Sequence, residues 1–284
     1  MAVTNSIQIA ELFTKLIDEK YHSTALSAVF ESNIVEIGSN YGKFHIMKVD
    51  TDGIGTYDRQ AGYPTGAVTL EWEEVSGDID LGARIVIDYY ENEEALAKAF
   101  SKASEDIVRK LIDEIDAIRF AKISQIAATK VAEDLTDGEA VVKSLRTAIN
   151  AMDNENVYDD KYLVATPEVL GYLEDMDSYK SKAVLGNFVG TIKVPHKKFY
   201  TSVDVQTGRG DSPKFNYTKT DGAKDINFMI VSKASVIAKT ETRIKVNENP
   251  ENFDGLMFSI REAGLSAYGL ENKVAGIYVS HTTV

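Results

Sequence analysis

The longest amphipathic segment of the chain covers residues 92–131 and contains neither glycine nor proline. Its apolar residues recur every three or four positions, which is the spacing of one helix face: Leu96, Phe100, Ala103, Ile107, Leu111, Ile115 and Ile118. Asn92 is a suitable N-cap for this helix. At 1.5 Å per residue the helix would be on the order of 60 Å long. The sequence therefore predicts a long, half-exposed helix that spans the molecule, here called the spine helix.

The segment before it, residues 44–88, has the two-residue period of β-strands. Apolar side chains alternate with polar ones on the returning strand: Val68, Leu70 and Trp72. The intervening residues 51–66 are rich in glycine and aspartate and include a proline, so they predict a long turn. Because an isolated two-stranded ribbon is marginal in water, we expect this hairpin to lie against something else, and a neighbouring subunit would serve.

Helices and strands alternate through the rest of the chain, which indicates a mixed α/β region. Thr136 and Glu139 form a capping-box pattern, and Thr166 followed by Pro167 predicts another helix start. A helical segment at residues 7–30, interrupted at Ser23 and Thr24, precedes the hairpin. The predicted strands of this region cover residues 162–165, 188–194, 199–205, 226–231, 236–246, 256–260 and 275–279.

Charge and composition exclude several classes of protein. Asp and Glu number 44 against 31 Lys and Arg, a net charge of −13, so a nucleic-acid reader with a basic patch is disfavoured. The densest basic segment, residues 193–198, is interpreted as a solvated loop. Without cysteine the chain has no disulfide, thiolate nucleophile or Cys-ligated metal. No segment resembles a secretory signal or a transmembrane span. We expect a soluble protein of about two domains that is made in the cytosol.

Patterns that carry catalysis are nearly absent. The four histidines lack metal-ligand spacing, no P-loop or nucleophile elbow occurs, and residues 50–53 only begin like a calcium loop. Asp113, Glu114 and Asp116 crowd carboxylates on the spine helix. Basic residues within two turns should hold them ionised, which favours a charged structural face over acid–base catalysis: Arg109, Lys110, Arg119 and Lys122. Residues 209–211, Arg-Gly-Asp, are interpreted as a turn rather than an adhesion motif. We predict no catalytic residue, cofactor or metal.

The order of these parts resembles the major capsid protein of tailed bacteriophages, with its Hong Kong 97-like fold. Residues 57–73 look like the hairpin signature of one coat-protein branch, and residues 114–120 are similar to that branch's spine-helix segment. Residues 226–231 and 276–279 are similar again, so the resemblance covers most of the chain. The sequence departs from the branch at residues 77–82, where an Asp-Arg-Gly turn is usual, and in having no proline before Glu114.

The resemblance implies an α+β fold in four parts. Residues 1–43 would form an N-terminal arm, and residues 44–88 an extended loop, a β-hairpin, laid over a neighbour. The spine helix within residues 89–132 and strands within 241–266 would form a peripheral domain. Residues 133–240 and 267–284 would form a mixed α/β axial domain.

The same resemblance implies a structural protein rather than an enzyme. It would assemble with itself, as pentamers and hexamers, into an icosahedral shell that encloses the double-stranded DNA of a tailed phage. A portal and a separate scaffold protein are the other implied partners, with no sequence-specific DNA binding and no membrane. The chain would be made in the cytoplasm of the host bacterium and would reside in the virion capsid.

We hypothesise an assembly interface at the hairpin tip and the spine. Its candidate residues are Asp52, Tyr57, Asp58, Arg59, Tyr63, Trp72, Arg84, Glu114 and Arg119. One alternative is the shell protein of an encapsulin-type nanocompartment, which shares the fold and would enclose cargo protein instead of DNA. A remoter alternative is an α/β enzyme whose site is assembled from scattered carboxylates.

Overall fold

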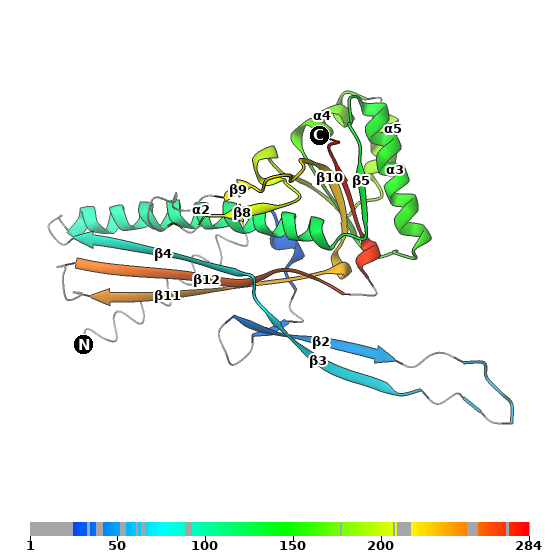
Figure 1. Ribbon diagram of the computed structural model, residues 1–284, viewed down its shortest axis with the longest axis horizontal. Helices are drawn as coiled ribbons and strands as arrows, with labels where there is room; N and C mark the ends of the chain where they lie inside the picture. Colours follow the sequence, from blue (N-terminus) through cyan, green and yellow to red (C-terminus); the bar gives the residue numbers. More distant parts are fainter. Residues whose placement is uncertain are drawn as a thin grey trace.

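The structure is a computed structural model. It describes residues 25–32, 35–37, 42–51, 55–60, 62–63, 66–88, 93–176, 178–206, 208, 217–248, 255–270 and 273–283. The molecule is elongated, with one long helix at its centre, sheets on either side of it and a two-stranded hairpin that extends from the body (Figure 1). Most of the helix predicted at residues 7–30 lies outside the described residues, and its last part is the short 3-10 helix η1 (Ala28–Phe30).

The predicted spine helix is α2 (Glu93–Ile126), which has 34 residues and is therefore about 50 Å long. Leu111 and Ile115, from the predicted apolar stripe, are 2% and 1% exposed and pack against Ile79, Ala83 and Ile260. This part of the stripe is confirmed, whereas the stripe side chains before Glu105 lie outside those that the structure describes.

The spine helix ends five residues earlier than predicted. Residues Thr129–Ala132 form strand β5, which pairs in parallel with β13 (Ile277–His281). The ammonium of Lys130 donates a hydrogen bond to the carbonyl of Gln125 at 2.8 Å, which satisfies one of the orphan carbonyls at the end of the helix. Thr129 and Val131 are β-branched and therefore suit a strand better than a further helical turn.

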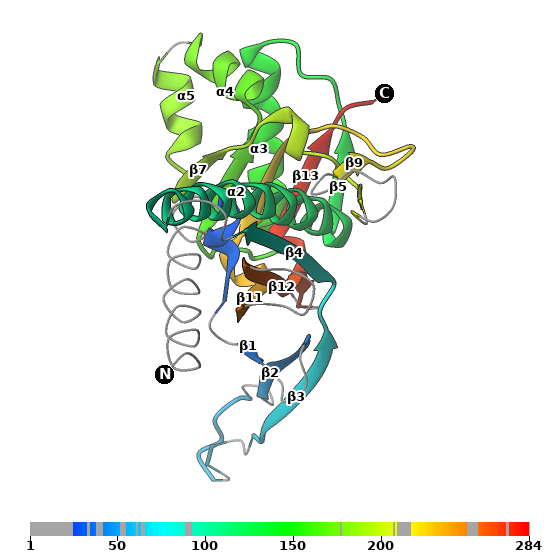
Figure 2. The same cartoon turned by 90° about the vertical axis from the view of Figure 1, so that its left-hand side faces the viewer.

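An antiparallel sheet lies along the spine helix (Figures 1 and 2). Its strand order is β11-β12-β4, with the bounds Val236–Glu248, Gly255–Gly269 and Ile79–Asp88. Strand β4 belongs to the segment 44–88 that the sequence suggested as one extended loop. Its hydrogen-bonded partner is nevertheless β12, with Ala83 opposite Ile260, so the hairpin proper ends before β4.

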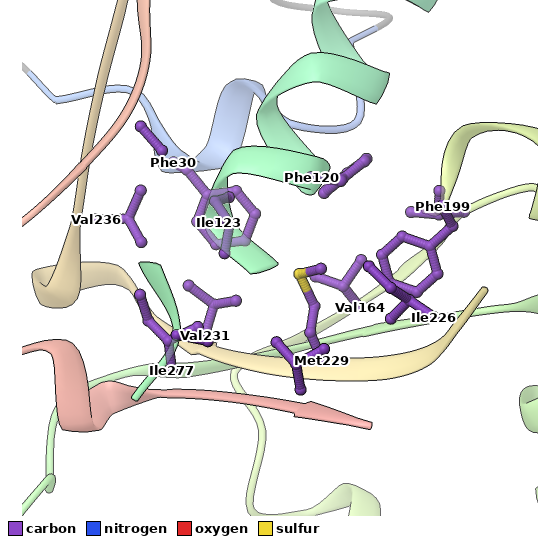
Figure 3. Packing of buried hydrophobic residues seen from close by; sticks show 14 residues of the cluster. Phe30, Phe120, Ile123, Val164, Phe199, Ile226, Met229, Val231, Val236 and Ile277 are labelled. Atoms are coloured by element: carbon purple, nitrogen blue, oxygen red, sulfur yellow. The ribbon is translucent and has the colours of Figure 1, made fainter. Parts of the chain in front are cut away.

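A second, five-stranded sheet lies at the end of the spine helix (Figure 1). Its order is β5-β13-β10-β6-β7, with β10 at Ile226–Ser232, β6 at Lys161–Ala165 and β7 at Gly190–Lys193. Strand β10 is buried on both faces because alternate side chains enter two different cores. Phe228 and Ile230 pack towards helices α3 (Gly138–Asn154), α4 (Pro167–Glu174) and α5 (Ser178–Leu185). Met229 and Val231 pack towards the end of the spine helix (Figure 3).

Two helix starts test the capping predictions. Thr166 accepts a hydrogen bond from the amide of Val169 at 3.4 Å and precedes Pro167, as predicted. The start of α3 differs, because its N-cap is Asp137, whose carboxylate accepts from the amide of Ala140 at 2.8 Å. The capping box centred on Thr136 is therefore wrong by one residue. The remaining short elements are η2 (His196–Lys198), β8 (Val203–Val205), β9 (Tyr217–Lys219), η3 (Lys233–Ser235) and η4 (Val274–Gly276).

Candidate assembly surface

The hairpin is anchored to the body at its base. Strands β2 (Lys43–Thr51) and β3 (Val68–Ser76) pair along their full nine residues, and β1 (Val35–Ile37) pairs only with the base of β2. Phe44 and Ile46, at that base, are fully buried and belong to a core cluster with Ile237 and Leu265 of the sheet beside the spine helix. In both views the outer part of the hairpin extends away from the body (Figures 1 and 2).

A polar contact also fixes the hairpin to the body. The hydroxyl of Tyr268 on β12 donates to Glu73 Oε2 at 2.7 Å, and Lys48 forms an ion pair with the same oxygen at 2.5 Å. Hydrogen bonds from Lys48 and Tyr268 hold the pKa of the Glu73 carboxyl below its usual range. The carboxylate therefore stays ionised at neutral pH and links the two hairpin strands to the neighbouring sheet.

The outer half of the hairpin has an apolar face that is exposed to solvent. Directly opposed residues of an antiparallel pair share a face, and the pairs Met47–Trp72 and Val49–Leu70 place their side chains together, with Val68 two residues before Leu70 on the same face. Val49 and Leu70 are each 55% exposed, Val68 is 69% exposed and Trp72 is 47% exposed. We call Met47, Val49, Val68, Leu70 and Trp72 the apolar hairpin face. The opposite face of this half is polar, with Lys48 opposite Glu71 and Asp50 opposite Thr69.

The tip of the hairpin has local structure of its own. Asp58 and Gly62 exchange two backbone hydrogen bonds, at 3.2 and 2.8 Å, and the Asp58 carboxylate accepts from the amide of Gln60 at 2.6 Å. Gly62 has φ 82°, a left-handed conformation that glycine adopts without steric cost. The rings of Tyr57 and Tyr63 lie 5.0 Å apart, yet both side chains are mostly exposed. The described residues of the tip thus form a small hydrogen-bonded loop whose aromatic side chains face solvent.

The structure brings together only some of the residues that were hypothesised as an assembly interface. Tyr57, Asp58, Arg59, Tyr63 and Trp72 all lie exposed on the hairpin. Arg84 is exposed on β4, outside the hairpin, and Asp52 lies outside the described residues. Sequence reasoning did not select Val49, Val68 and Leu70 as contact residues. Their alternation along the strands was visible, and only their exposure was not.

Glu114 and Arg119 are not surface residues of the spine helix: their exposures are 2% and 0%. Arg119 forms an ion pair with Glu31 at 2.5 Å and donates to the Thr240 hydroxyl at 3.0 Å. Asp116, one turn away, accepts from the amide of Ser27 at 3.0 Å and from its hydroxyl at 2.7 Å. These contacts join the segment around η1 to the spine helix, so they act within the subunit.

The expectation that nearby basic residues hold the spine carboxylates ionised is wrong for Glu114. Burial, followed by the charge of Asp113, raises the pKa of Glu114 to about 7. Burial also raises the pKa of Asp116, against hydrogen bonds from Ser27 and Leu26 and the charge of Lys198. Arg119 does not neutralise these groups because its guanidinium is engaged by Glu31, whereas Asp113 pairs with Lys198.

Within the part of the chain that the structure describes, no group of three or more His, Asp or Glu side chains is placed to hold a metal ion. None of the helices in the same part combines the length and the apolar character needed to cross a membrane.

The chain is similar to known proteins in structure but not in sequence. No family model and no curated protein matches the chain. A structure of Gordonia phage Cozz matches with a TM-score of 0.56 at 11% identity, over 92% of this chain and 87% of that one. The capsid of Myoviridae phage XM1 matches with a TM-score of 0.54 at 12% identity, over 90% and 92%. A virus-like particle from Pyrococcus furiosus matches with a TM-score of 0.53 at 12% identity, over 92% and 98%.

These matches extend over nearly the whole of both chains. At such low identity they establish the fold alone. The chain therefore has the α+β, Hong Kong 97-like fold of tailed-phage major capsid proteins, as the sequence resemblance implied.

Proposed function

We propose that this protein is the major capsid protein of a tailed phage, a structural subunit that assembles with copies of itself into a closed shell. The observation that carries the proposal is the apolar hairpin face, an exposed strip on a ribbon that extends from the body. An exposed apolar strip of this kind marks an interaction surface. The capsid fold supports a shell as the assembly that the strip serves.

The geometry of the hairpin suits a repeating, ring-closing contact. A surface that meets a different surface on the next copy produces rings when the rotation closes. The base of the hairpin is anchored in the core, and the outer half extends away from that core. The outer half is therefore free to lie on a second copy. Each such contact is repeated in every subunit, and many modest contacts can then hold a shell.

The finer assignment follows from the resemblance. The shell would be icosahedral, built from pentamers and hexamers, and would enclose double-stranded DNA inside the virion, with a portal and a separate scaffold protein as partners. The net charge of −13 suits a container that holds nucleic acid without gripping it. The division into arm, extended loop, peripheral and axial domains is part of the same proposal, with the loop shortened to end before β4. The role is structural and not enzymatic, which the capsid-like fold supports.

The proposal is tested with two variants of the hairpin that differ only in the face they alter. Val49→Ser with Leu70→Ser replaces an opposed pair on the apolar hairpin face, and Asp50→Asn with Thr69→Ser replaces the next opposed pair, on the polar face. We expect closed particles of the unaltered chain and of the polar-face control by negative-stain electron microscopy and light scattering, and few or none of the apolar-face variant. A stable monomer of the unaltered chain at tens of micromolar, with and without a scaffold protein, would overturn the proposal.

A nanocompartment shell is the second candidate, favoured by the match to the Pyrococcus virus-like particle, of which 98% is covered. The two candidates differ in what the particle encloses. Nuclease treatment of purified particles, followed by extraction, should leave protected double-stranded DNA if the chain is a phage capsid protein. Protected cargo protein without DNA would identify the nanocompartment instead.

A further inference from the structure

A pocket of about 420 Å³ lies between the spine helix and strand β9, away from the hairpin. The spine helix supplies Lys110, Asp113 and Glu114 to its wall, and the facing segments supply Lys197, Tyr217 and Lys219, with Tyr200 completing the lining. The assembly function proposed above makes no use of this site. Its polar lining points to a ligand with charged or hydrogen-bonding groups.

The pocket contains a buried polar group without a partner. Glu114 is only 2% exposed, and its Oε1 has no hydrogen-bond partner among the residues that the structure describes. Buried carboxyl oxygens are normally hydrogen-bonded, and one that is not has a substantial free-energy cost. Burial keeps Glu114 neutral more readily than an ordinary glutamate, with a pKa raised to about 7. A neutral carboxyl group has an O–H donor to offer.

The charges around Glu114 are mostly balanced, with one exception. Lys110 pairs with Asp106 at 2.6 Å, Lys219 pairs with Asp225 at 2.8 Å, and Lys198 pairs with Asp113. Within the residues that the structure describes, Lys197 has no ion pair. Within the described residues, the lining therefore carries one unbalanced positive charge, on Lys197, and one carboxyl group, that of Glu114, whose Oε1 has no partner.

The tyrosines do not alter this balance. The Tyr217 hydroxyl donates to the backbone carbonyl of Lys197 at 2.9 Å, so its proton is already engaged. Burial, followed by the charge of Asp113, raises the pKa of the Tyr217 phenol, which stays neutral. Tyr200 faces Lys219, whose ammonium lies 5.3 Å from the centre of its ring.

We propose that this pocket binds the carboxylate group of a ligand, which accepts a hydrogen bond from the neutral carboxyl group of Glu114 and is neutralised by the ammonium of Lys197. A singly charged anion matches the one unbalanced lysine. A cationic ligand fits less well, because it would lie among three lysine side chains and would require Glu114 to ionise. The ligand's negative charge further favours the protonated form of Glu114, so binding and protonation of Glu114 support each other.

Acetate is a suitable probe because it stays ionised above about pH 6. Isothermal titration calorimetry of the full chain at constant ionic strength should give an affinity about tenfold higher at pH 6 than at pH 8, the ratio expected for one linked proton with a midpoint near 7. Glu114→Gln should bind acetate equally at the two pH values, because its amide donates at both. Lys197→Gln should bind about three- to fivefold more weakly than the unaltered chain.

Lys193→Gln is the matched control, since it removes an exposed lysine of β7 outside the pocket. It should change neither the affinity nor its pH dependence. The proposal is wrong if the unaltered chain binds no acetate at pH 6, if its affinity is the same at pH 6 and pH 8, or if Lys197→Gln and Lys193→Gln behave alike.

The carboxylate could belong to a small acid or to an acidic side chain of a second copy, and light scattering at pH 6 separates these sources. If it belongs to a second copy, saturating acetate should reduce self-association of the unaltered chain but not of Lys197→Gln, relative to chloride at equal ionic strength. If it belongs to a small acid, acetate should leave self-association unchanged while the calorimetric binding persists.

Discussion

Arg119 shows how one residue joins segments that are far apart in the sequence. Its guanidinium contacts Glu31, 88 residues earlier, and Thr240, 121 residues later, while its own backbone belongs to the spine helix. The side chain is fully buried and that of Glu31 is 9% exposed. Removing one member of a buried ion pair leaves the other charge uncompensated, which costs far more than the loss of an exposed pair.

We therefore expect Arg119→Ala to lower the free energy of unfolding by about 3–5 kcal/mol. Arg109→Ala is the control on the same helix, because Arg109 is 73% exposed and pairs with Asp106 at the surface, and it should cost less than about 1 kcal/mol. Urea denaturation of the dissociated subunit measures both. In the double variant Glu31→Ala with Arg119→Ala, the loss should be smaller than the sum of the two single losses, and strict additivity would show that the pair is not coupled.

The raised pKa of Glu114 makes the free energy of unfolding depend on pH. Its pKa is about 7 in the folded chain and near 4.5 when unfolded, so the folded state binds the proton more tightly. The contribution of Glu114 to the free energy of unfolding is therefore greatest below about pH 4.5, falls as the pH rises towards 7 and stays low above it. Glu114→Gln removes the ionisable group, and we expect it to raise the free energy of unfolding by roughly 1–3 kcal/mol at pH 8 and by much less at pH 5.

Glu71→Gln, at an exposed glutamate of the hairpin, serves as the control for this experiment. Denaturation of both variants and of the unaltered chain at pH 5 and pH 8 gives the comparison. A stabilisation by Glu114→Gln that is equal at the two pH values would contradict the buried, neutral carboxyl group on which the pH dependence depends.

At the scale of residues, the sequence showed which side chains are charged but not which are buried. Glu114 and Arg119 occupy a helix whose sequence alternates charged and apolar residues, so a solvated face was the reasonable interpretation. Arg119 is covered by the segment around η1 and by β11, through Glu31 and Thr240. Glu114 instead lines a pocket with Lys197, Tyr200 and Tyr217. Local periodicity cannot reveal a partner that lies 88 or 121 residues away.

At the scale of elements, the corner at Gly77 separates the hairpin from the sheet beside the spine helix. The Gly77 amide donates to the Gly42 carbonyl at 2.7 Å. A Cβ atom at Gly77 would lie 2.6 Å from the Gly264 carbonyl oxygen and 2.8 Å from the Phe44 ring. The next residue, Asp78, accepts from the amide of Ser266 at 2.7 Å. The chain can change sheets here because only glycine permits this close approach.

Gly77→Ala should consequently lower the free energy of unfolding by about 1–3 kcal/mol, since backbone atoms must shift to admit the methyl group. Gly82→Ala is the matched control on β4, because among the described residues its Cβ would meet the Ile260 carbonyl oxygen alone, at 3.6 Å. It should be neutral or slightly stabilising. Thermal melting of the two variants compares them directly, and equal melting temperatures would show that the corner tolerates a side chain.

Elements with a strong local signal were predictable, and those defined by their partners were not. The spine helix and the start of α4 followed from periodicity and from Thr166 with Pro167. The end of the spine helix was misplaced because residues 127–131 continue without glycine or proline, and pairing of β5 with β13 decides their conformation. Likewise β4 looked like part of the hairpin, since nothing in its sequence reveals that β12 lies beside it.

At the scale of the whole molecule, the hairpin has two parts that could contact a neighbouring copy. The apolar hairpin face lies on the paired strands, whereas Tyr57, Asp58, Arg59 and Tyr63 belong to the tip beyond them. The sequence indicated that this ribbon needs a partner, because two strands alone bury little apolar surface. It selected mainly tip residues as contacts, and the structure adds the strip on the strands as a second candidate.

Shortening the hairpin separates the contribution of the tip from that of the strip, and it also separates folding from assembly. Replacing residues 52–67 with Asn-Gly leaves two residues between Thr51 and its partner Val68. Asn-Gly is a turn sequence that two-residue hairpins prefer. The subunit should keep its circular dichroism spectrum and melt within a few degrees of the unaltered chain, because the buried anchor at Phe44 and Ile46 lies at the opposite end of the strands. Particles should nevertheless be lost, since every subunit loses the same contact and the loss is repeated around the shell.

Normal particles from the shortened chain, together with loss of particles from the variant with serine at positions 49 and 70, would place the whole contact on the strip. An unfolded shortened chain would show instead that the tip stabilises the subunit itself.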